Sequence, residues 1–372
     1  MSHLAAVCLA KGQPFELQTR PTPKPCPGEL LIAVKSVALN PADCIMRAQG
    51  LFIPSHPTVI GFDVAGLVLE VGDNVPVNTT DDESSPSFRP GVTRVAAYAA
   101  SFWRSFDPDY GIFQERCLVP WQHAIPLPDT GISWNEAATL PVACQVPLNA
   151  WDLMGIPRIG EAPSYSTSPP VGKSDVLLIW GASSSVGSMG VQTARLLRED
   201  PASSFAAVYA TAGAVNMQFV ASLGADRVFD YKEPGVVGNI ILAAKKDGLV
   251  IRHSFLATGK LESCQAVLKA FLEDYETEKE QKAKIASAPV IPPGTEIEGI
   301  ETMFVFPSLE EEERLAQFQY WMGWPRNNLA NGSIRPSPEL KVVGKGLEAV
   351  DPGLDILSRG VSCTKLVVEI SE

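Results

Sequence analysis

Residues 176–197 decide the fold of this chain, and they read VLLIWGASSSVGSMGVQTARLL. Residues 176–180 form a continuous apolar run, which is typical of a strand buried on both faces of a sheet. A turn of small residues follows at 181–185, and the apolar residues after it recur at the spacing of one broad helix face. A strand, a Gly/Ser turn and a helix together place backbone N–H groups and a helix N-terminus against a pyrophosphate. The motif therefore favours a dinucleotide site. The turn is not a strict G-x-G-x-x-G, so an ordinary α/β turn remains an alternative.

The composition predicts a globular protein of about two domains, since 45% of the 372 residues are hydrophobic and 19% are charged. The net charge of −12 argues against duplex DNA or an anionic membrane as the main partner. No apolar run approaches the roughly 18 residues that cross a bilayer. The seven cysteines are scattered without a Cys-x-x-Cys pair, and no charged-then-apolar leader opens the chain. These features predict a reduced, cytoplasmic protein.

The pattern of elements divides the chain into three parts. Before residue 147, short candidate strands with Gly and Pro between them favour a barrel-like β domain. From residue 175 to about 287, strands at 176–180, 206–211 and 227–230 alternate with helical segments, which predicts a parallel sheet with right-handed crossovers. A strand at 366–370 closes the chain and is expected to return to the β domain. Within the first part, Gly66 predicts a bulge in the strand at 64–71, and residues 148–154 predict a helix.

The end of the second buried strand indicates which nicotinamide cofactor fits. An acidic side chain there accepts a hydrogen bond from the adenosine 2′-OH and selects NAD. No Asp or Glu occurs from residue 203 to residue 225. Since a carboxylate would repel a 2′-phosphate, its absence permits NADP(H). Asn216 and Tyr231 can donate to that phosphate with Lys232 nearby, although Tyr231 is equally well an ordinary aromatic residue at a strand end.

Several further segments together resemble the medium-chain dehydrogenase/reductase superfamily. They read ALNPAD at 38–43, IGFDVAG at 60–66, GIFQE at 111–115, EAATLP at 136–141 and SCTKLV at 362–367, and they run in family order over nearly the whole chain. The chain resembles in particular the fungal ToxD-like branch, which includes trans-acting enoyl reductases of polyketide synthase pathways. A Pro-rich segment at 159–173 and an acidic run at 310–314 fit that branch.

The resemblance implies an α/β fold in which a Rossmann doubly wound parallel sheet, residues 148–309, accompanies a GroES-like β-barrel domain, residues 1–147 and 310–372. It implies an NADPH-dependent, zinc-independent oxidoreductase of secondary metabolism. Hydride would pass from NADPH to the β-carbon of an alkene, with protonation at the α-carbon. The substrate would be an acyl, polyketide or polyketide–amino-acid intermediate, carried on the carrier domain of a polyketide synthase. The protein would be a monomer or a homodimer.

The resemblance also implies positions for the site. The cofactor would meet Ala42, Asp43, Cys44 and Ile45 on the nicotinamide side, Ser183, Ser184, Ser185 and Val186 at the pyrophosphate, and Gly213, Asn216 and Tyr231 at the adenosine phosphate; Ser287, Ala288, Cys363 and Thr364 would complete the cleft. The acyl pocket would be lined by Leu140, Pro141, Val142, Ala143, Cys144, Gln145, Val146 and Pro147. Asp43, Cys44 and Tyr110 are candidate proton donors, and no catalytic residue is assigned among them.

Metal binding and some positions depart from the superfamily pattern. Zinc-dependent relatives carry a Cys near Asn40 and a Gly-His-Glu at 61–63, where this chain has Gly-Phe-Asp, so we predict no metal. Relatives often have a Lys at Ile45, a Thr at Val146 and a small residue at Pro147. These departures keep two alternatives open: a free-standing quinone or enone oxidoreductase, and a cofactor-binding member repurposed for non-redox chemistry such as cyclisation or isomerisation.

Overall fold

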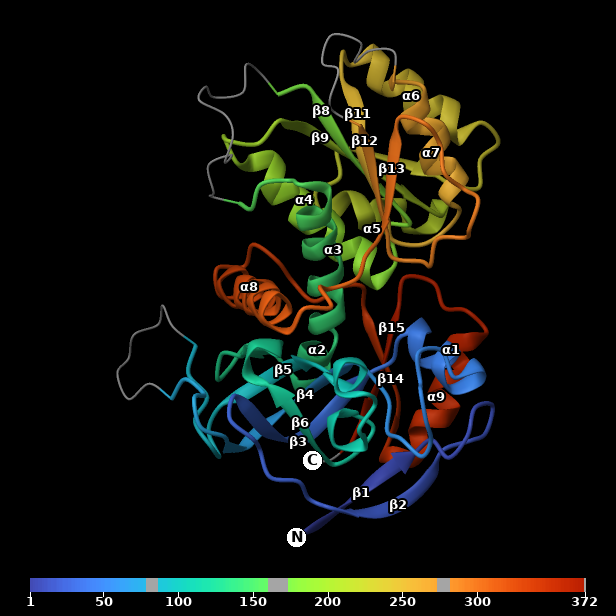
Figure 1. Cartoon of the computed structure of the whole chain (residues 1–372). Coiled ribbons are helices and arrows are strands. Elements are labelled where there is room, and N and C mark those ends of the chain that lie inside the picture. Colours follow the sequence, from blue (N-terminus) through green and yellow to red (C-terminus); the bar gives the residue numbers. More distant parts are fainter. Residues whose placement is uncertain (78–85, 160–172, 273–281, 371–372) are drawn as a thin grey trace. The chain divides into compact units, whose positions relative to one another are not determined.

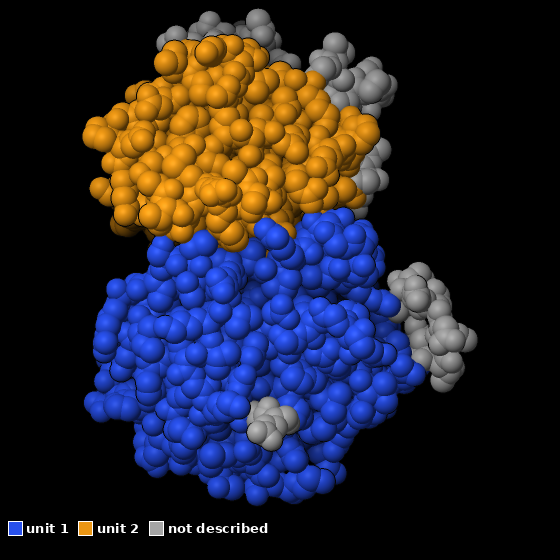
Figure 2. Space-filling view, turned by 180° about the vertical axis from the view of Figure 1, so that it is seen from behind, with its two compact units in different colours: residues 1–145, 308–372 blue, residues 146–307 orange. Residues whose placement is uncertain are grey.

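The structure is a computed structural model that describes residues 1–77, 86–159, 173–272 and 282–370 (Figure 1). The chain divides into two compact units, which Figure 2 distinguishes by colour. Unit 1 comprises residues 1–145 and 308–372, and unit 2 comprises residues 146–307. The Pro-rich segment expected at 159–173 lies almost entirely outside the described residues.

Unit 2 is built on a sheet of six parallel strands in the order β10-β9-β8-β11-β12-β13. Their bounds are β8 (Asp175–Trp180), β9 (Phe205–Ala212), β10 (Arg227–Asp230), β11 (Val250–Leu256), β12 (Ala283–Ser287) and β13 (Ile300–Phe304). The strand β8 is central and buried along its whole length, as its apolar run predicts. From β8 the chain winds outward to β9 and β10, and it then crosses back to place β11 on the other side of β8. This is the strand order of dinucleotide-binding sheets, whose ligands bind at the carboxyl ends beside that switch point.

Helices cover both faces of this sheet. The helices α4 (Ser185–Glu199) and α5 (Met217–Ser222) pack on β8, β9 and β10, whereas α6 (Val236–Lys246) and α7 (Leu261–Lys269) pack mainly on β10 to β13. Figure 1 shows α4 on one side of the sheet and α6 with α7 on the other. The predicted doubly wound α/β unit is confirmed.

Unit 1 is a β domain to which both ends of the chain contribute. Its seven-stranded sheet has the order β14-β15-β3-β4-β5-β7, and β6 also pairs with β3. The bounds are β3 (Glu29–Ala38), β4 (Asp63–Val71), β5 (Arg94–Tyr98), β6 (Arg116–Pro120), β7 (Ala124–Pro126), β14 (Leu340–Lys345) and β15 (Lys365–Glu369), with a separate hairpin of β1 (Ser2–Val7) and β2 (Glu16–Pro21). The C-terminal strand β15 runs antiparallel to β3. The register of β3 and β4 shifts twice, once at Lys35 of β3 opposite Gly66 and once at Leu69 of β4, so the strand at 64–71 contains a bulge, at Leu69. The backbone of β3 approaches Gly66 too closely for any side chain.

The helices of the rest of the chain are α1 (Pro41–Gln49), α2 (Trp134–Ala138), α3 (Leu140–Met154), α8 (Glu311–Ala330) and α9 (Val350–Ser358). The helix predicted at 148–154 begins eight residues earlier, so the residues expected to line the acyl pocket lie on α3. Pro141 is tolerated there because the first turn of a helix has amides without helical partners. Pro147 lies inside α3 and removes one backbone amide from its hydrogen-bond ladder. Among the described residues, no helix is both long and apolar enough to span a bilayer.

Candidate active site

The turn after β8 depends on two glycines. Gly181 has a φ of +80°, and a Cβ there would lie 2.5 Å from the side chain of Thr258. Its N–H donates to the hydroxyl of Thr211 at the end of β9. A Cβ on Gly187 would lie 2.4 Å from the Gly181 carbonyl oxygen. Both glycines are therefore required by the close approach of the turn to the neighbouring strand ends and to the start of α4.

The N-terminus of α4 fits a phosphate group. The hydroxyl of Ser184 caps the helix by accepting from the Gly187 N–H at 3.1 Å. The hydroxyl of Ser185 is buried, and among the described residues it has no hydrogen-bond partner. A buried hydroxyl without a partner costs free energy, and here it accompanies the N-terminus of a 15-residue helix. A phosphate oxygen would satisfy that hydroxyl and the first amides of the helix together. Ser183 and Val186, also predicted for this role, flank it in the same turn.

The carboxyl ends of β9 and β10 bring Gly213 and Tyr231 together. A Cβ on Gly213 would lie 3.7 Å from the Tyr231 ring and 3.9 Å from its hydroxyl, which leaves room for a side chain there. The Tyr231 side chain is 46% exposed, and the Lys232 ammonium lies 5.7 Å from its ring centroid. Asp230 ends β10, but its carboxylate accepts the backbone N–H of Lys232. Asn216 lies in the short turn that leads from Gly213 into α5.

The predicted residues at the end of β12 have more ordinary roles. The hydroxyl of Ser287 donates to the carbonyl of Pro289 at 2.7 Å, and the N–H of Ala288 donates to the carbonyl of Leu256. Because β8, β9, β11 and β12 are parallel, Ser287 shares the carboxyl edge of the sheet with the Gly181 turn. The sheet therefore places the unit 2 positions predicted for the cofactor along one edge.

Unit 1 contains a buried polar cluster that comprises Asn40, Asp63 and Lys365. The Lys365 ammonium donates to the Asn40 side-chain oxygen at 2.6 Å and to Asp63 Oδ2 at 2.9 Å. The Asn40 amide donates to Asp63 Oδ2 at 3.0 Å. The other oxygen of Asp63 accepts the backbone N–H of Val142 at 2.7 Å. The cluster thus joins the start of α1, the first residue of β4, the first turn of α3 and the first residue of β15.

The cluster includes Asn40 and Asp63, which belong to the segments where the superfamily pattern led us to predict no metal. Asn40 and Asp63 both bind the ammonium of Lys365. The buried carboxylate therefore has an internal cation as its partner. Within the described part of the chain, no group of three or more His, Cys, Asp or Glu side chains is placed to hold a metal ion.

Known proteins resemble this chain in sequence and in fold. The alcohol dehydrogenase GroES-like domain matches residues 26–129. The trans-enoyl reductase tndF of Aspergillus flavipes is 39% identical over 99% of this chain and 99% of its own length. The trans-enoyl reductase tazE of Aspergillus terreus is 38% identical over 84% of this chain and 94% of its own length. The chain belongs to the trans-enoyl reductase family. An alcohol dehydrogenase superfamily protein from Novosphingobium aromaticivorans shares the fold, with a TM-score of 0.74 at 20% identity and coverage of 99% of this chain and 100% of that one.

The three candidate proton donors of this trans-enoyl reductase differ in the pKa of their acidic group. Asp43 is fully buried on α1, and one of its oxygens accepts the Asn40 backbone N–H while the other has no partner among the described residues. Burial raises the pKa of Asp43 to about 7, although the Asn40 N–H and the Lys365 ammonium oppose that rise. Burial raises the pKa of the Cys44 thiol to about 11. The Tyr110 hydroxyl donates to Glu29 at 2.7 Å, and burial with that bond raises its pKa. Of the three, Asp43 exchanges its proton near neutral pH.

Tyr98 is a further residue beside the cluster that sequence reasoning did not find. It pairs with Asp63 across β5 and β4. Burial raises the pKa of its hydroxyl, and the negative charges of Asp63 and Asp43 raise it further. Asn40, Asp63 and Lys365 were visible in three separate motifs of the sequence, but nothing in their spacing indicated that they meet. Of the other predicted positions, Ile45 is 39% exposed on α1.

The remaining unit 1 positions lie on α3 and before β15. Leu140, Cys144 and Gln145 are buried on α3. Cys363 has a φ of +50°, and the Thr364 hydroxyl donates to the carbonyl of Ser362. The residues predicted to bind the cofactor are thus divided between the two units of the trans-enoyl reductase.

Proposed function

We propose that this protein is an NADPH-dependent enoyl reductase that acts in trans on a polyketide or polyketide–amino-acid intermediate carried on the carrier domain of a synthase. The observation that carries the proposal is the likeness to two trans-enoyl reductases, at 39% and 38% identity over most of the chain. Both relatives are fungal, which supports a place in fungal secondary metabolism.

The choice of NADPH rests on the carboxyl ends of β9 and β10. The segment from residue 203 to residue 225 has no carboxylate, and Asp230 is turned toward the backbone of Lys232. The Tyr231 hydroxyl supplies a donor beside Gly213, and the Lys232 ammonium supplies a positive charge 5.7 Å from the Tyr231 ring centroid. A 2′-phosphate is stabilised by such groups, whereas a 2′-OH gains little from them.

The residues of the chain have three tasks in this reaction. Bound NADPH would supply the hydride that reduces the alkene. The Gly181 turn, Ser185 and the N-terminus of α4 would hold its pyrophosphate. The α-carbon of the reduced substrate then needs a proton, and Asp43 holds one near neutral pH. Asp43 is fully buried, so we assign it a proton-holding role behind Tyr98 or solvent rather than direct contact with the substrate.

Ile45 supports an apolar substrate at its position. Relatives often present a lysine there, which would anchor a carboxylate or a phosphate. An exposed Ile on α1 offers hydrocarbon contact instead. We therefore expect this face of the site to contact the acyl chain.

The test is turnover of an enoyl thioester by the purified wild-type protein. We expect NADPH to be oxidised with one equivalent of saturated thioester formed, measured by absorbance and by mass spectrometry, and NADH to support a kcat/KM at least about tenfold lower. Absence of turnover with short, medium and branched enoyl thioesters, combined with reduction of free quinones or enones, would replace the proposal by a free-standing oxidoreductase. Tight NADPH binding with rearranged but unreduced substrate would indicate non-redox chemistry.

A further inference from the structure

Tyr98 is the last residue of β5 and lies beside the buried polar cluster of unit 1. It pairs with Asp63 across the antiparallel strands β5 and β4. The side chains of directly paired residues lie on the same face of a sheet, with Cβ atoms about 4.5–5.5 Å apart. The Asp63 carboxylate also accepts the backbone N–H of Val142, in the first turn of α3. Tyr98 therefore flanks the carboxylate that binds the helix predicted to line the acyl pocket.

The ring of Tyr98 is held by aromatic contacts from four other segments of unit 1. Pairs of aromatic rings at centroid separations of about 4.5–7 Å attract one another, and they fix the position of each ring. The four centroid distances from Tyr98 are 5.6 Å to Phe62, 5.9 Å to Trp103, 6.3 Å to His123 and 5.1 Å to Phe318. None of these contacts uses the hydroxyl, so a phenylalanine would pack equally well here.

The backbone of Tyr98 is fixed as well. Its carbonyl lies 3.2 Å from Nδ1 of His123, which is fully buried. Burial lowers the pKa of His123 to about 3, so the imidazole is neutral near pH 7 and carries one N–H. Because a carbonyl only accepts, that N–H is at Nδ1 and donates to Tyr98. The end of β5 is thus positioned by both its ring and its backbone.

The hydroxyl of Tyr98 has no task in the packing of the chain. Tyr98 is half-buried, and among the described residues its hydroxyl takes part in no hydrogen bond. A hydroxyl that is moved out of water without a partner costs free energy. A bound ligand that accepts a hydrogen bond would recover this cost, and the partial exposure of Tyr98 leaves access for one.

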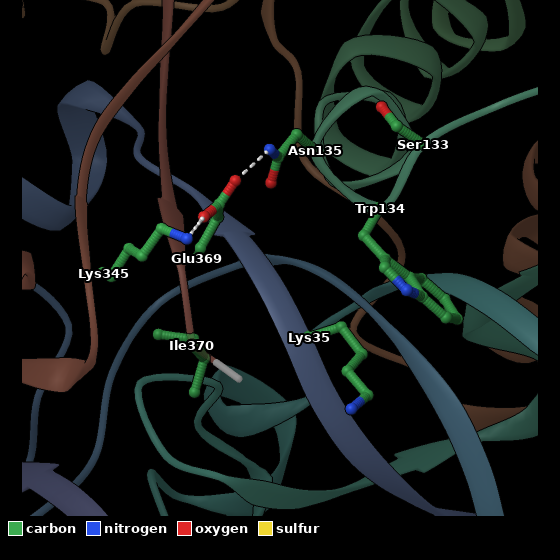
Figure 3. Close-up of a pocket in the computed structure, with 7 residues that line it drawn as sticks. All are labelled: Lys35, Ser133, Trp134, Asn135, Lys345, Glu369 and Ile370. Atoms are coloured by element: carbon green, nitrogen blue, oxygen red, sulfur yellow. Dashed lines mark hydrogen bonds and ion pairs between the residues drawn. The ribbon is translucent and has the colours of Figure 1, made fainter. Parts of the chain in front are cut away.

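A pocket of about 330 Å³ in unit 1 provides a comparison (Figure 3). It lies at the far end of β15 from Lys365, and its lining residues are Lys35, Ser133, Trp134, Asn135, Lys345, Glu369 and Ile370. The Glu369 carboxylate there accepts from the Asn135 amide at 2.8 Å and lies 3.2 Å from the Lys345 ammonium, as Figure 3 shows. These three groups bind one another, whereas the Tyr98 hydroxyl has no such partner.

The charges around Tyr98 keep its hydroxyl protonated. Burial raises the pKa of Tyr98, and the negative charges of Asp63 and then Asp43 raise it further. Tyr98 therefore remains a hydrogen-bond donor throughout the neutral pH range. The Asp63 charge is compensated by the Lys365 ammonium at 2.9 Å, so an oxygen that gains negative charge beside Tyr98 meets little net repulsion from this pair.

We propose that Tyr98 is a catalytic residue whose hydroxyl donates a hydrogen bond to the carbonyl oxygen of the enoyl thioester. This inference rests on the proposed function and adds to it the group that stabilises the charge formed during reduction. The hydride forms a C–H bond at the β-carbon, so that the alkene is reduced and the nicotinamide oxidised. The π electron pair of the alkene then joins the carbonyl as an enolate, with negative charge on its oxygen. A proton at the α-carbon completes the second C–H bond and restores the carbonyl.

A donor at this oxygen accelerates the reaction because the oxygen is more negative in the transition state than in the substrate. Removing one such donor from an enzyme typically lowers kcat about a hundredfold or more. The loss falls mainly on kcat rather than on KM, since the hydrogen bond to the neutral carbonyl of the substrate is weaker.

The first test is the variant Tyr98→Phe, which removes the hydroxyl and keeps the ring. With NADPH and crotonyl-N-acetylcysteamine we expect kcat to fall about a hundredfold while KM stays within about threefold of the wild type. The midpoint of thermal unfolding should stay near the wild-type value, because the four ring contacts remain. The matched control is Tyr209→Phe in β9, whose hydroxyl donates to Asp247 at 2.6 Å. It should lower the midpoint and leave kcat within about twofold.

The second test observes the hydrogen bond without turnover. Crotonyl-N-acetylcysteamine with a ¹³C-labelled carbonyl is bound together with NADP+, which has no hydride to give, and its infrared carbonyl band is recorded. A hydrogen bond weakens the carbonyl bond and lowers its stretching frequency. The band should therefore lie at lower frequency in the wild type than in Tyr98→Phe, and Tyr209→Phe should match the wild type.

The two tests separate this inference from the proposed function. The role of Tyr98 is overturned if Tyr98→Phe keeps kcat within about twofold of the wild type, or if the carbonyl bands of the two complexes coincide. Absence of turnover by the wild type on every enoyl thioester would instead overturn the proposed function, and the role of Tyr98 with it.

Discussion

Removing the cation of the buried ion pair in unit 1 should cost far more stability than removing the cation of the exposed pair between Lys345 and Glu369. Lys365 is 4% exposed and Asp63 is 0% exposed, with an N–O distance of 2.9 Å. Lys365→Met removes the ammonium and leaves the Asp63 carboxylate buried without its cation. Breaking a buried pair in this way costs about 3–5 kcal/mol of the free energy of unfolding.

The matched control is Lys345→Met, at the pair that Lys345 forms with Glu369. The two side chains of that pair are 74% and 32% exposed at 3.2 Å. Water screens such a pair, so the control should lose no more than about 1 kcal/mol. The double variant Lys365→Met/Asp63→Asn removes both buried charges, while the new amide oxygen can still accept the Val142 N–H. It should lose less than Lys365→Met loses alone.

The assay is native-state hydrogen exchange of the β3, β4 and β15 amides, because a chain of two units need not unfold in a single step. Urea unfolding followed by circular dichroism provides the second measurement. Losses in Lys365→Met and Lys345→Met that agree to within about 1 kcal/mol would refute the reasoning. A double variant that is less stable than Lys365→Met would show that the cost lies outside the charge left on Asp63.

Three further outcomes follow from single positions. Since the pKa of Asp43 is raised to about 7 in the folded protein, the free energy of unfolding of the wild type should fall as pH rises from about 4 to about 7. Asp43→Asn should remove that fall. Free energies of unfolding that change with pH in parallel for the two proteins would contradict this. Gly181→Ala forces a Cβ against Thr258 at positive φ, so it should destabilise unit 2 by about 1–3 kcal/mol and weaken NADPH binding. Its control is Gly238→Ala, in open space on α6, which should stabilise unit 2 by up to about 1 kcal/mol. Thermal unfolding and NADPH titration measure both variants. Gly213→Asp has room for its side chain and places a carboxylate where it would repel a 2′-phosphate. The KM for NADPH should rise about tenfold or more, without a similar effect on the KM for NADH. An equal change for both cofactors would exclude this strand end as the phosphate site.

Local patterns in the sequence were sufficient to predict much of the fold. The apolar run at 176–180 with its Gly/Ser turn predicted the central strand and the helix after it, because those signals depend only on neighbouring residues. The alternation of strands and helices predicted the parallel sheet. The helix α3 was predicted too short, because Pro141 and Pro147 obscured its first half. In a sequence, a proline usually signals the end of a helix. Pro141 is tolerated because it lies in the first turn of α3, and Pro147 lies inside a helix that tertiary packing holds.

The sequence by itself determined the strand–turn–helix of the cofactor domain, the missing acid near residue 213 and the family pattern along the chain. Only the tertiary structure decided that Asn40, Asp63 and Lys365 meet, because residues up to 325 positions apart come together when β15 pairs with β3. The same pairing brings Ile370 beside Lys35 at the other end of β15. The pKa of Asp43 likewise depends on burial among groups from other segments. Local periodicity encodes elements, whereas charge partners and desolvation arise only when distant segments pack together.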